Sequence, residues 1–199
     1  MNTETARFNM IEQQIRPWEV LDAHVLSLLA TVRREDFVPP ALKAMAFVDT
    51  QVPLIAGRPD GPHMLEPRVE ARLLQELKVQ RHEKALEIGT GSGFMAALLA
   101  HRAQTVVTLE CVPELAQVAR DNLRRNGLLN VQVVEVSAAE GARGHAVDAP
   151  YDVILLSGSV AEVPQSLLHQ LKDGGRLLAV VGQEPMIRAV RIPRLSANH

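Results

Sequence analysis

Cysteine is nearly absent from this sequence of 199 residues, in which Cys111 is the one example. An intramolecular disulfide is therefore excluded, and the first residues, MNTETARFNM, lack the basic and then apolar pattern of a secretory signal. No apolar run approaches the roughly 18 to 20 residues that a membrane-spanning helix needs. These absences predict a soluble, cytoplasmic protein that does not enter a membrane.

Aromatic residues are also scarce, at 3% of the chain, and the formal net charge is only -2. Few side chains remain for stacking unpaired bases, and no general positive charge attracts a phosphate backbone, so we expect no nucleic-acid partner. Hydrophobic residues nevertheless reach 47%, which is ample for a sizeable core. We expect one globular unit, with a monomer as the favoured state.

Residues 67–199 show a regular alternation of short apolar segments and helical patterns. Apolar strands that alternate with helices predict an α/β fold with a doubly wound, mostly parallel sheet. The predicted strands are 84–88, 105–110, 131–136, 152–156 and 176–181, and the predicted helices are 92–102, 113–125 and 164–171. The last residues, MIRAVRIPRLSANH, alternate like a strand that begins a C-terminal hairpin, which we expect to be incomplete.

Residues 1–66 differ in pattern and predict an N-terminal helical extension packed on the α/β part. Apolar residues at helical spacing indicate helices at 4–16 and 20–31, with Thr3 and Asp22 as caps and a break at Pro17. The stretch RPDGPHMLEP at 58–67 contains three prolines and a glycine, so it predicts a loop without regular helix or strand. No serine, threonine or cysteine occurs between Thr50 and Thr90.

The predicted strand 84–88 leads into the glycine-rich sequence LEIGTGSGF at 86–94. A dinucleotide fingerprint needs glycine where Phe94 stands, and the Gly-Lys-Ser/Thr ending of a phosphate loop is missing. Bare glycine backbone, helix amides near Ser92 and the charge of Glu87 suit a ligand that carries a carboxylate and an ammonium. Glu110 ends the next strand, where an acidic side chain can accept ribose hydroxyls. S-adenosylmethionine is a ligand that has both a ribose and an amino acid headgroup. The alternative to a cofactor site is that these glycines only form a tight turn and that Glu87 and Glu110 are solvated charges.

LEIGTGSG followed by VVTLE resembles motif I and its acidic successor in class I S-adenosylmethionine-dependent methyltransferases, which have a Rossmann-like fold. Ser137-Ala138 take the place where many of these enzymes have an Asp that contacts the adenine amine. Here the serine, a backbone amide or neither makes that contact, and an ordinary turn is the alternative. Ser157 follows strand 152–156 without the Asn/Asp-Pro-Pro-aromatic element of base and glutamine methyltransferases and without the acidic metal ligand of catechol-type enzymes, so no metal is expected. The resemblance implies these cofactor-binding residues: Glu87, Gly89, Thr90, Gly91, Ser92, Gly93, Glu110, Cys111, Ser137, Ala138 and Ser157.

The rest of the chain is similar to the protein-L-isoaspartate (D-aspartate) O-methyltransferases. The similarity runs through MIEQQIRPWEVLDAHVLSLLATVRREDFVP, AFVDTQVPL, LEIGTGSGFMAALLA and YDVILLSGSVAEVPQSLLHQLKDGGRLLAVVG, in the family's order. It implies that an isoaspartyl carboxylate of a protein or peptide substrate attacks the sulfonium methyl group. The resulting ester closes to a succinimide, which can reopen as normal aspartate, so the activity implied is protein repair.

The family's loop G-x-T-I-S-x-P, which packs over the methyl donor and binds the substrate carboxylate, has no direct match here. Counting back from Glu87 puts T-I-S on His63, Met64 and Leu65, whereas counting forward from Asp49 puts the serine on Gly61. The two registers differ by a four-residue insertion, and neither supplies a hydroxyl. Candidate loop contacts are Arg58, His63 and Leu65; methylation of a different acceptor, or cofactor binding without isoaspartyl activity, are the alternatives.

Overall fold

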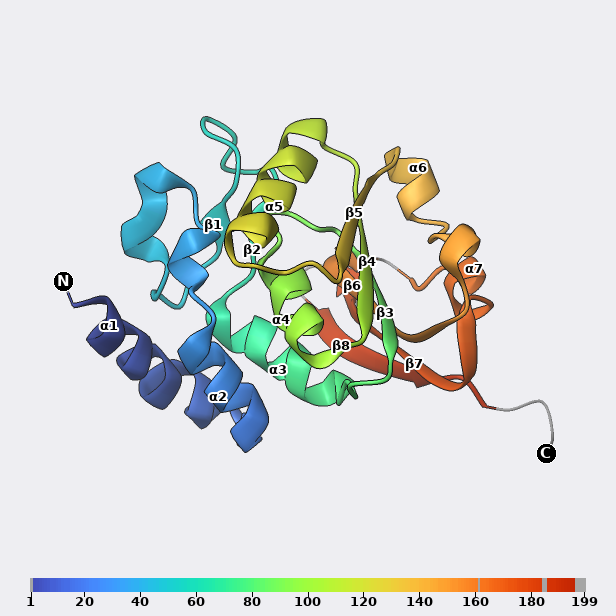
Figure 1. The fold of residues 1–199 in the computed structure, drawn as a ribbon, viewed down its shortest axis with the longest axis horizontal. Helices are drawn as coiled ribbons and strands as arrows, with labels where there is room; N and C mark the ends of the chain where they lie inside the picture. The colour runs from blue at the N-terminus through green and yellow to red at the C-terminus, as the bar shows by residue number, and fades with distance from the viewer. Residues whose placement is uncertain (1, 161, 184–185, 196–199) are drawn as a thin grey trace.

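The computed structural model describes residues 2–160, 162–183 and 186–195, and a twisted sheet forms its centre (Figure 1). The strand order is β5-β4-β3-β6-β7-β8, and every neighbouring pair is parallel except β7 with β8. The predicted doubly wound α/β fold is therefore confirmed. The strands are β3 (Lys84–Ile88), β4 (Thr105–Glu110), β5 (Val131–Glu135), β6 (Tyr151–Val160), β7 (Leu171–Gln183) and β8 (Met186–Pro193).

Helices cover both faces of this sheet, because its central strands are apolar on both sides. Neighbouring residues of β3 show the alternation: Ala85 packs in one buried cluster and Leu86 in the other. Helices α3, α4 and α5 lie on the first face, and α6 and α7 lie on the second (Figure 1). Their bounds are α3 (Pro67–Leu77), α4 (Phe94–Arg102), α5 (Pro113–Arg125), α6 (Ala138–Gly141) and α7 (Gln165–Leu168).

The N-terminal extension is helical, as predicted, and it packs beside α3. Asp22 caps its second helix by accepting from the amides of His24 and Val25, but Thr3 is not a cap, because Asn2 accepts from the first free amides. Among the described residues, no helix has the length and apolarity needed to cross a bilayer. The elements are α1 (Thr3–Met10), η1 (Ile11–Ile15), η2 (Arg16–Trp18), α2 (Ala23–Thr31), η3 (Arg34–Asp36) and η4 (Pro40–Met45).

A small hairpin follows the extension, and it corrects the prediction of a loop without strands. β1 (Val52–Pro53) pairs antiparallel with β2 (His63–Met64), and the Leu54 amide continues the pairing by donating to the Pro62 carbonyl at 2.9 Å. Because each of these strands has only two residues, their pairing needs few amide donors. The prolines just outside β2 therefore do not prevent it. Residues 55–61 form the tip, which projects from the molecule in Figure 1.

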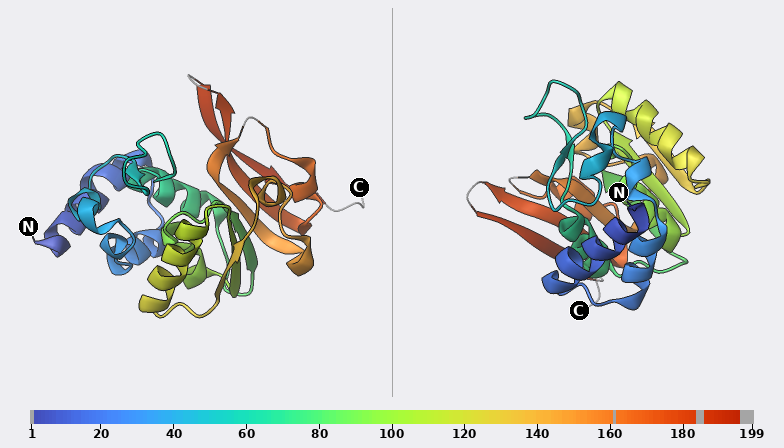
Figure 2. Two further views of the ribbon diagram at one scale, coloured as in Figure 1. Left: turned by 90° about the horizontal axis from the view of Figure 1, so that it is seen from above. Right: turned by 90° about the vertical axis from the view of Figure 1, so that its left-hand side faces the viewer.

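The alternating pattern near the end of the sequence predicts a strand, and β8 is that strand. β8 pairs antiparallel with β7 from Gln183 opposite Met186 to Arg176 opposite Pro193, so these two strands are the two arms of the hairpin. Figure 2 shows that this hairpin reaches beyond the rest of the sheet.

Candidate active site

The glycine-rich turn lies between β3 and α4, at the point where the sheet order reverses and where open α/β sheets bind ligands. Gly91 has a φ of +56°, and a Cβ there would lie 3.0 Å from Cδ1 of Leu54. A side chain would therefore strain the turn and push Leu54 away. The amides of Gly89 and Thr90 both donate to the Leu109 carbonyl, at 3.0 and 3.1 Å, and this fixes the turn to the end of β4.

Glu110, at the end of β4, holds the same turn from the other side. Its Oε2 accepts from the Gly91 amide at 2.8 Å, and its Oε1 accepts from the amides of Cys111 and Val112, each at 3.0 Å. A carboxylate offers about four lone-pair sites, so these three bonds leave room for one further donor. The carboxylate is both a structural brace for the turn and an acceptor at the rim of the cleft.

Glu87 is fully buried below the turn, inside a chain of hydrogen bonds. The hydroxyl of Thr108 donates to its Oε1 at 2.6 Å, and the hydroxyl of Ser157 donates to its Oε2 at 2.8 Å. Burial raises the pKa of Glu87 to about 7, although these two hydroxyls oppose the shift. Near neutral pH, a small change in local charge therefore changes the protonation of this carboxyl.

Two cavities meet above the turn and form one continuous cleft. The first, of about 480 Å³, lies against the hairpin and α3, and the second, of about 410 Å³, lies against α6. They share Gly89, Glu110, Cys111 and Gly158. The second cavity is walled largely by apolar side chains, including Val136 and Leu156, whereas the first is reached by polar side chains such as Gln51 and His63. The cleft suits an elongated ligand with an apolar ring at one end and polar groups at the other.

The hairpin covers the first cavity with β2 and the residue after it. His63 and Leu65 line this cavity, whereas Gly61 does not. This arrangement agrees with the register counted back from Glu87, in which His63, Met64 and Leu65 replace the hydroxyl-bearing segment. In that register the predicted four-residue insertion falls within the exposed tip, where the Gly61 amide closes a turn on the Arg58 carbonyl at 3.0 Å.

Arg34, one of the most deeply buried side chains, fixes that covering segment from behind. Its guanidinium donates to the carbonyls of Leu65 and Ala46 at 2.8 and 2.6 Å, and to Oε2 of Glu70 at 3.1 Å. It also lies 5.4 Å from the ring centroid of Phe94. Burial raises the pKa of Glu70, an effect that Arg34 opposes. The backbone of the covering segment is thus positioned by a buried charge.

The structure brings some of the predicted site residues into the cleft and leaves others outside it. Thr90 and Ser92 line a small cavity behind the turn, and Glu87 lies beneath it. Gly93 is the N-cap residue of α4, and Ser137 caps α6 by accepting from the Glu140 amide at 3.2 Å. Arg58 is exposed on the tip, away from both cavities. The predicted residues that line the cleft are Gly89, Gly91, Glu110, Cys111, Ala138, Ser157, His63 and Leu65.

Sequence reasoning missed several residues that shape the cleft. Leu54, the residue after β1, lies against the glycine turn, and Gly158 lies in an irregularity of β6 where no side chain blocks the cleft. Thr108 was detectable, because a polar residue inside the apolar strand TVVTLE needs a partner when it is buried. Leu54 carried no such signal, because an apolar residue in a predicted loop has no distinct pattern.

Comparisons with known proteins agree with this geometry. The family model described as protein-L-isoaspartate (D-aspartate) O-methyltransferase matches residues 5–197. A protein-L-isoaspartate O-methyltransferase of Methanoculleus marisnigri is 39% identical over 176 residues, which cover 88% of this chain and 77% of that relative. Another of that name, from Myxococcus xanthus, is 41% identical over 163 residues, which cover 82% of this chain and 74% of that relative.

Solved structures share the fold at lower sequence identity. A protein-L-isoaspartate O-methyltransferase superposes with a TM-score of 0.79 and 23% identity, over 98% of this chain and 60% of that one. A β-aspartate methyltransferase from Plasmodium falciparum, solved in complex with S-adenosyl-L-homocysteine, gives a TM-score of 0.69 and 18% identity, over 98% of this chain and 96% of that one.

We predict that Arg34→Met lowers the free energy of unfolding by about 3 to 5 kcal/mol, because it leaves Glu70 buried without its partner. Arg34→Met with Glu70→Leu should recover part of this loss, since no charge then remains buried. Arg16→Met, which breaks an exposed pair with Glu12 at 2.8 Å, is the matched control and should cost below about 1 kcal/mol. Urea denaturation measures all three; equal losses for Arg34→Met and Arg16→Met would contradict the role given to Arg34.

Proposed function

Since the chain belongs to the protein-L-isoaspartate (D-aspartate) O-methyltransferase family, we propose that it methylates isoaspartyl carboxylates of damaged proteins with S-adenosylmethionine as methyl donor. The observation that carries the proposal is the position of the segment His63–Leu65. This segment comes from outside the α/β part and covers the cleft at the glycine turn. A cofactor in the cleft and an acceptor under the hairpin would meet at that place.

The residues of the cleft fit S-adenosylmethionine. The apolar cavity beside Val136 and Ala138 suits the adenine ring, and Glu110 has one lone-pair site left for a ribose hydroxyl. Gly89 and Gly91 leave bare backbone for the amino acid headgroup, whose ammonium would lie near the Ser157 hydroxyl, which is itself bonded to Glu87. When bound, the cofactor supplies an activated methyl group on its sulfonium.

The protein's part in the reaction is to position the acceptor and exclude water. A carboxylate with a pKa near about 4 is already ionised at neutral pH, so the transfer needs no general base. What remains is to hold one carboxylate oxygen in line with the methyl carbon in a dry site. Leu65 and Leu54 exclude water from the first cavity. The ring of His63 is the polar side chain of the covering segment; its Nδ1 lies 3.1 Å from the Gly61 carbonyl, so Nε2 of the protonated ring is the donor for the carboxylate.

A second candidate function is methylation of a different acceptor. It is favoured by Leu65, an apolar side chain at the place where the family's serine would stand. The location and assembly are also part of the proposal: a lone cysteine is compatible with the reducing cytoplasm. The active form proposed with this location is a monomer.

The direct test is transfer of labelled methyl groups to an isoaspartyl peptide, with the matching normal aspartyl peptide as substrate control. We expect methylation of the isoaspartyl peptide alone. Glu110→Ala should raise the KM for the cofactor by about 10- to 100-fold, because it removes a charged acceptor and frees three amides of the turn. Glu114→Ala, at an exposed carboxylate on α5, should leave KM unchanged. No transfer above background at saturating cofactor would contradict the proposal.

Cofactor affinity should depend on pH through Glu87. The ammonium of the cofactor favours an ionised Glu87, so the protein binds fewer protons when the cofactor is bound. Cofactor affinity should therefore rise with pH and level off once the pH exceeds about 7, the pKa of Glu87 in the free protein. The change should approach tenfold per pH unit below that value. Glu87→Gln should flatten the profile. Calorimetry between about pH 5.5 and 7.5, below the ordinary titration of the amino group, measures this; a wild-type profile as flat as that of the variant would contradict it.

The same shift has the opposite effect on the stability of the free protein. Burial raises the pKa of Glu87 above its unfolded value, so its contribution to folding is fully present below the unfolded pKa and is lost as pH rises through about 7. Unfolding curves of the free protein at each pH should therefore accompany the binding calorimetry, so that the effect of pH on stability is separated from its effect on cofactor affinity.

The covering segment gives a third test. His63→Ala should raise the KM for the isoaspartyl peptide by about 10- to 100-fold and leave cofactor affinity unchanged, because it removes a donor to the carboxylate. Leu65→Ser, which restores a hydroxyl in the register supported by the structure, should lower that KM. Arg58→Ala on the exposed tip is the control and should change neither. If His63→Ala, Leu65→Ser and Arg58→Ala all have the same KM for the isoaspartyl peptide, the covering segment does not bind the acceptor.

A further inference from the structure

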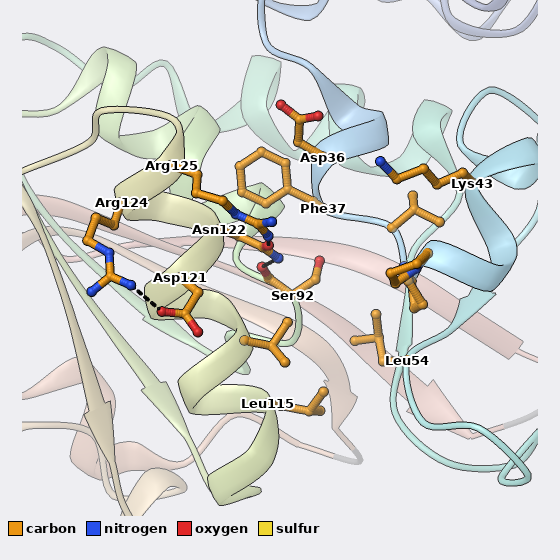
Figure 3. A pocket seen from close by; sticks show the side chains of 14 residues that line it. Asp36, Phe37, Lys43, Leu54, Ser92, Leu115, Asp121, Asn122, Arg124 and Arg125 are labelled. Carbon is orange, nitrogen blue, oxygen red and sulfur yellow. Dashed lines mark hydrogen bonds and ion pairs between the residues drawn. The ribbon is translucent and has the colours of Figure 1, made fainter.

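Another large cavity, separate from the two that form the cleft, lies beside the proposed site, between α5 and the segment from η3 to η4. It has a volume of about 570 Å³ and is shown in Figure 3. The mechanism proposed above does not use it. Leu54 and Ser92 line this cavity and also the small cavity behind the glycine turn, and Leu54 lines the covered cleft as well. The cavity therefore adjoins the place where the acceptor must lie, with Leu54 as the common wall.

The charges around this cavity do not cancel. Asp121 pairs with Arg124 at 2.7 Å, and Asp36 pairs with Arg33 at 3.4 Å. Arg125 instead donates to the neutral amide oxygen of Asn122. Among the residues that the structure describes, Lys43 has no ion-pair partner. Lys43 and Arg125 extend toward the cavity from opposite walls in Figure 3, so the surplus charge on the lining is positive.

Apolar side chains line the same cavity as these two cations. Val118 on α5 lines the cavity and is 44% exposed. Leu115, Pro40 and Leu54 complete the apolar part of the lining. A free inorganic anion would gain nothing from such a lining. A polypeptide segment with an apolar side chain and an acidic one matches both features.

We propose that this cavity binds the part of the substrate polypeptide next to the isoaspartyl residue, and that it selects an acidic side chain there. The inference rests on the proposed function, because it assigns the neighbouring cleft to the isoaspartyl carboxylate. A chain that leaves that cleft past Leu54 enters this cavity directly. Lys43 and Arg125 act on specificity and touch neither the cofactor nor the reacting carboxylate.

The test uses a series of isoaspartyl peptides in which glutamate, glutamine or lysine replaces each residue flanking the isoaspartate in turn. With the wild type, glutamate at one or more of these positions should lower KM about threefold to tenfold relative to lysine, the range expected for two exposed ion pairs. Lys43→Glu combined with Arg125→Glu should reverse this preference. Arg81→Glu, at an exposed cation beyond the opposite end of β3, should preserve it.

A minimal isoaspartyl peptide without flanking residues serves as the control substrate. The wild type, the double variant and Arg81→Glu should have the same cofactor affinity and the same rate with this peptide. Equal values would show that the double variant is folded. An equal preference in the wild type and the double variant, or no preference at all, would overturn the proposal. If the wild type methylates no isoaspartyl peptide, the proposed function fails separately. Fluorescence anisotropy with the labelled glutamate peptide then decides: tighter binding to the wild type than to the double variant supports the cavity, and equal binding refutes it.

Discussion

The buried guanidinium of Arg34 connects parts of the chain that are far apart in sequence. It bonds to carbonyls on either side of the small hairpin, at Ala46 and Leu65, and to Glu70 of α3, while its face lies against Phe94 at the start of α4. A buried charge is tolerated only when its donors are satisfied. The hairpin, α3 and the glycine turn must therefore keep one mutual arrangement, and that arrangement creates the covered cleft.

This constraint acts on backbone atoms, so the side chains of the covering segment can vary while its position is kept. Arg34 holds the carbonyl of Leu65, and the Leu54 amide bonds to the Pro62 carbonyl, whatever side chains those residues carry. An insertion is accommodated in the tip at 55–61, outside both bonds. A cover that lacks hydroxyls can thus stay over the cleft, and its chemistry then depends on His63 and on the apolar side chains of Leu54 and Leu65 that line the same cavity.

Much of this arrangement was predictable from the sequence, and the remainder depends on contacts that no local pattern shows. Strands 84–88 and 105–110 and helix 113–125 were predicted with their observed bounds, because long apolar or amphipathic segments carry a clear periodicity. β1, β2 and α6 were missed, because two to four residues show no period. The pairing of Arg34 with Glu70 spans 36 positions, so no local pattern shows it. The sequence left two registers of the covering segment open, and the residues that line the cleft favour one of them.

The central claim is that the segment His63–Leu65 binds the acceptor over the glycine turn. A crystal structure with S-adenosylhomocysteine and an isoaspartyl peptide tests it most directly. The account predicts the ribose on Glu110, the isoaspartyl carboxylate within hydrogen-bond distance of His63, and Arg34 still bonded to the Leu65 carbonyl. A carboxylate held elsewhere, or a hairpin displaced from Arg34 with the peptide bound, would contradict it.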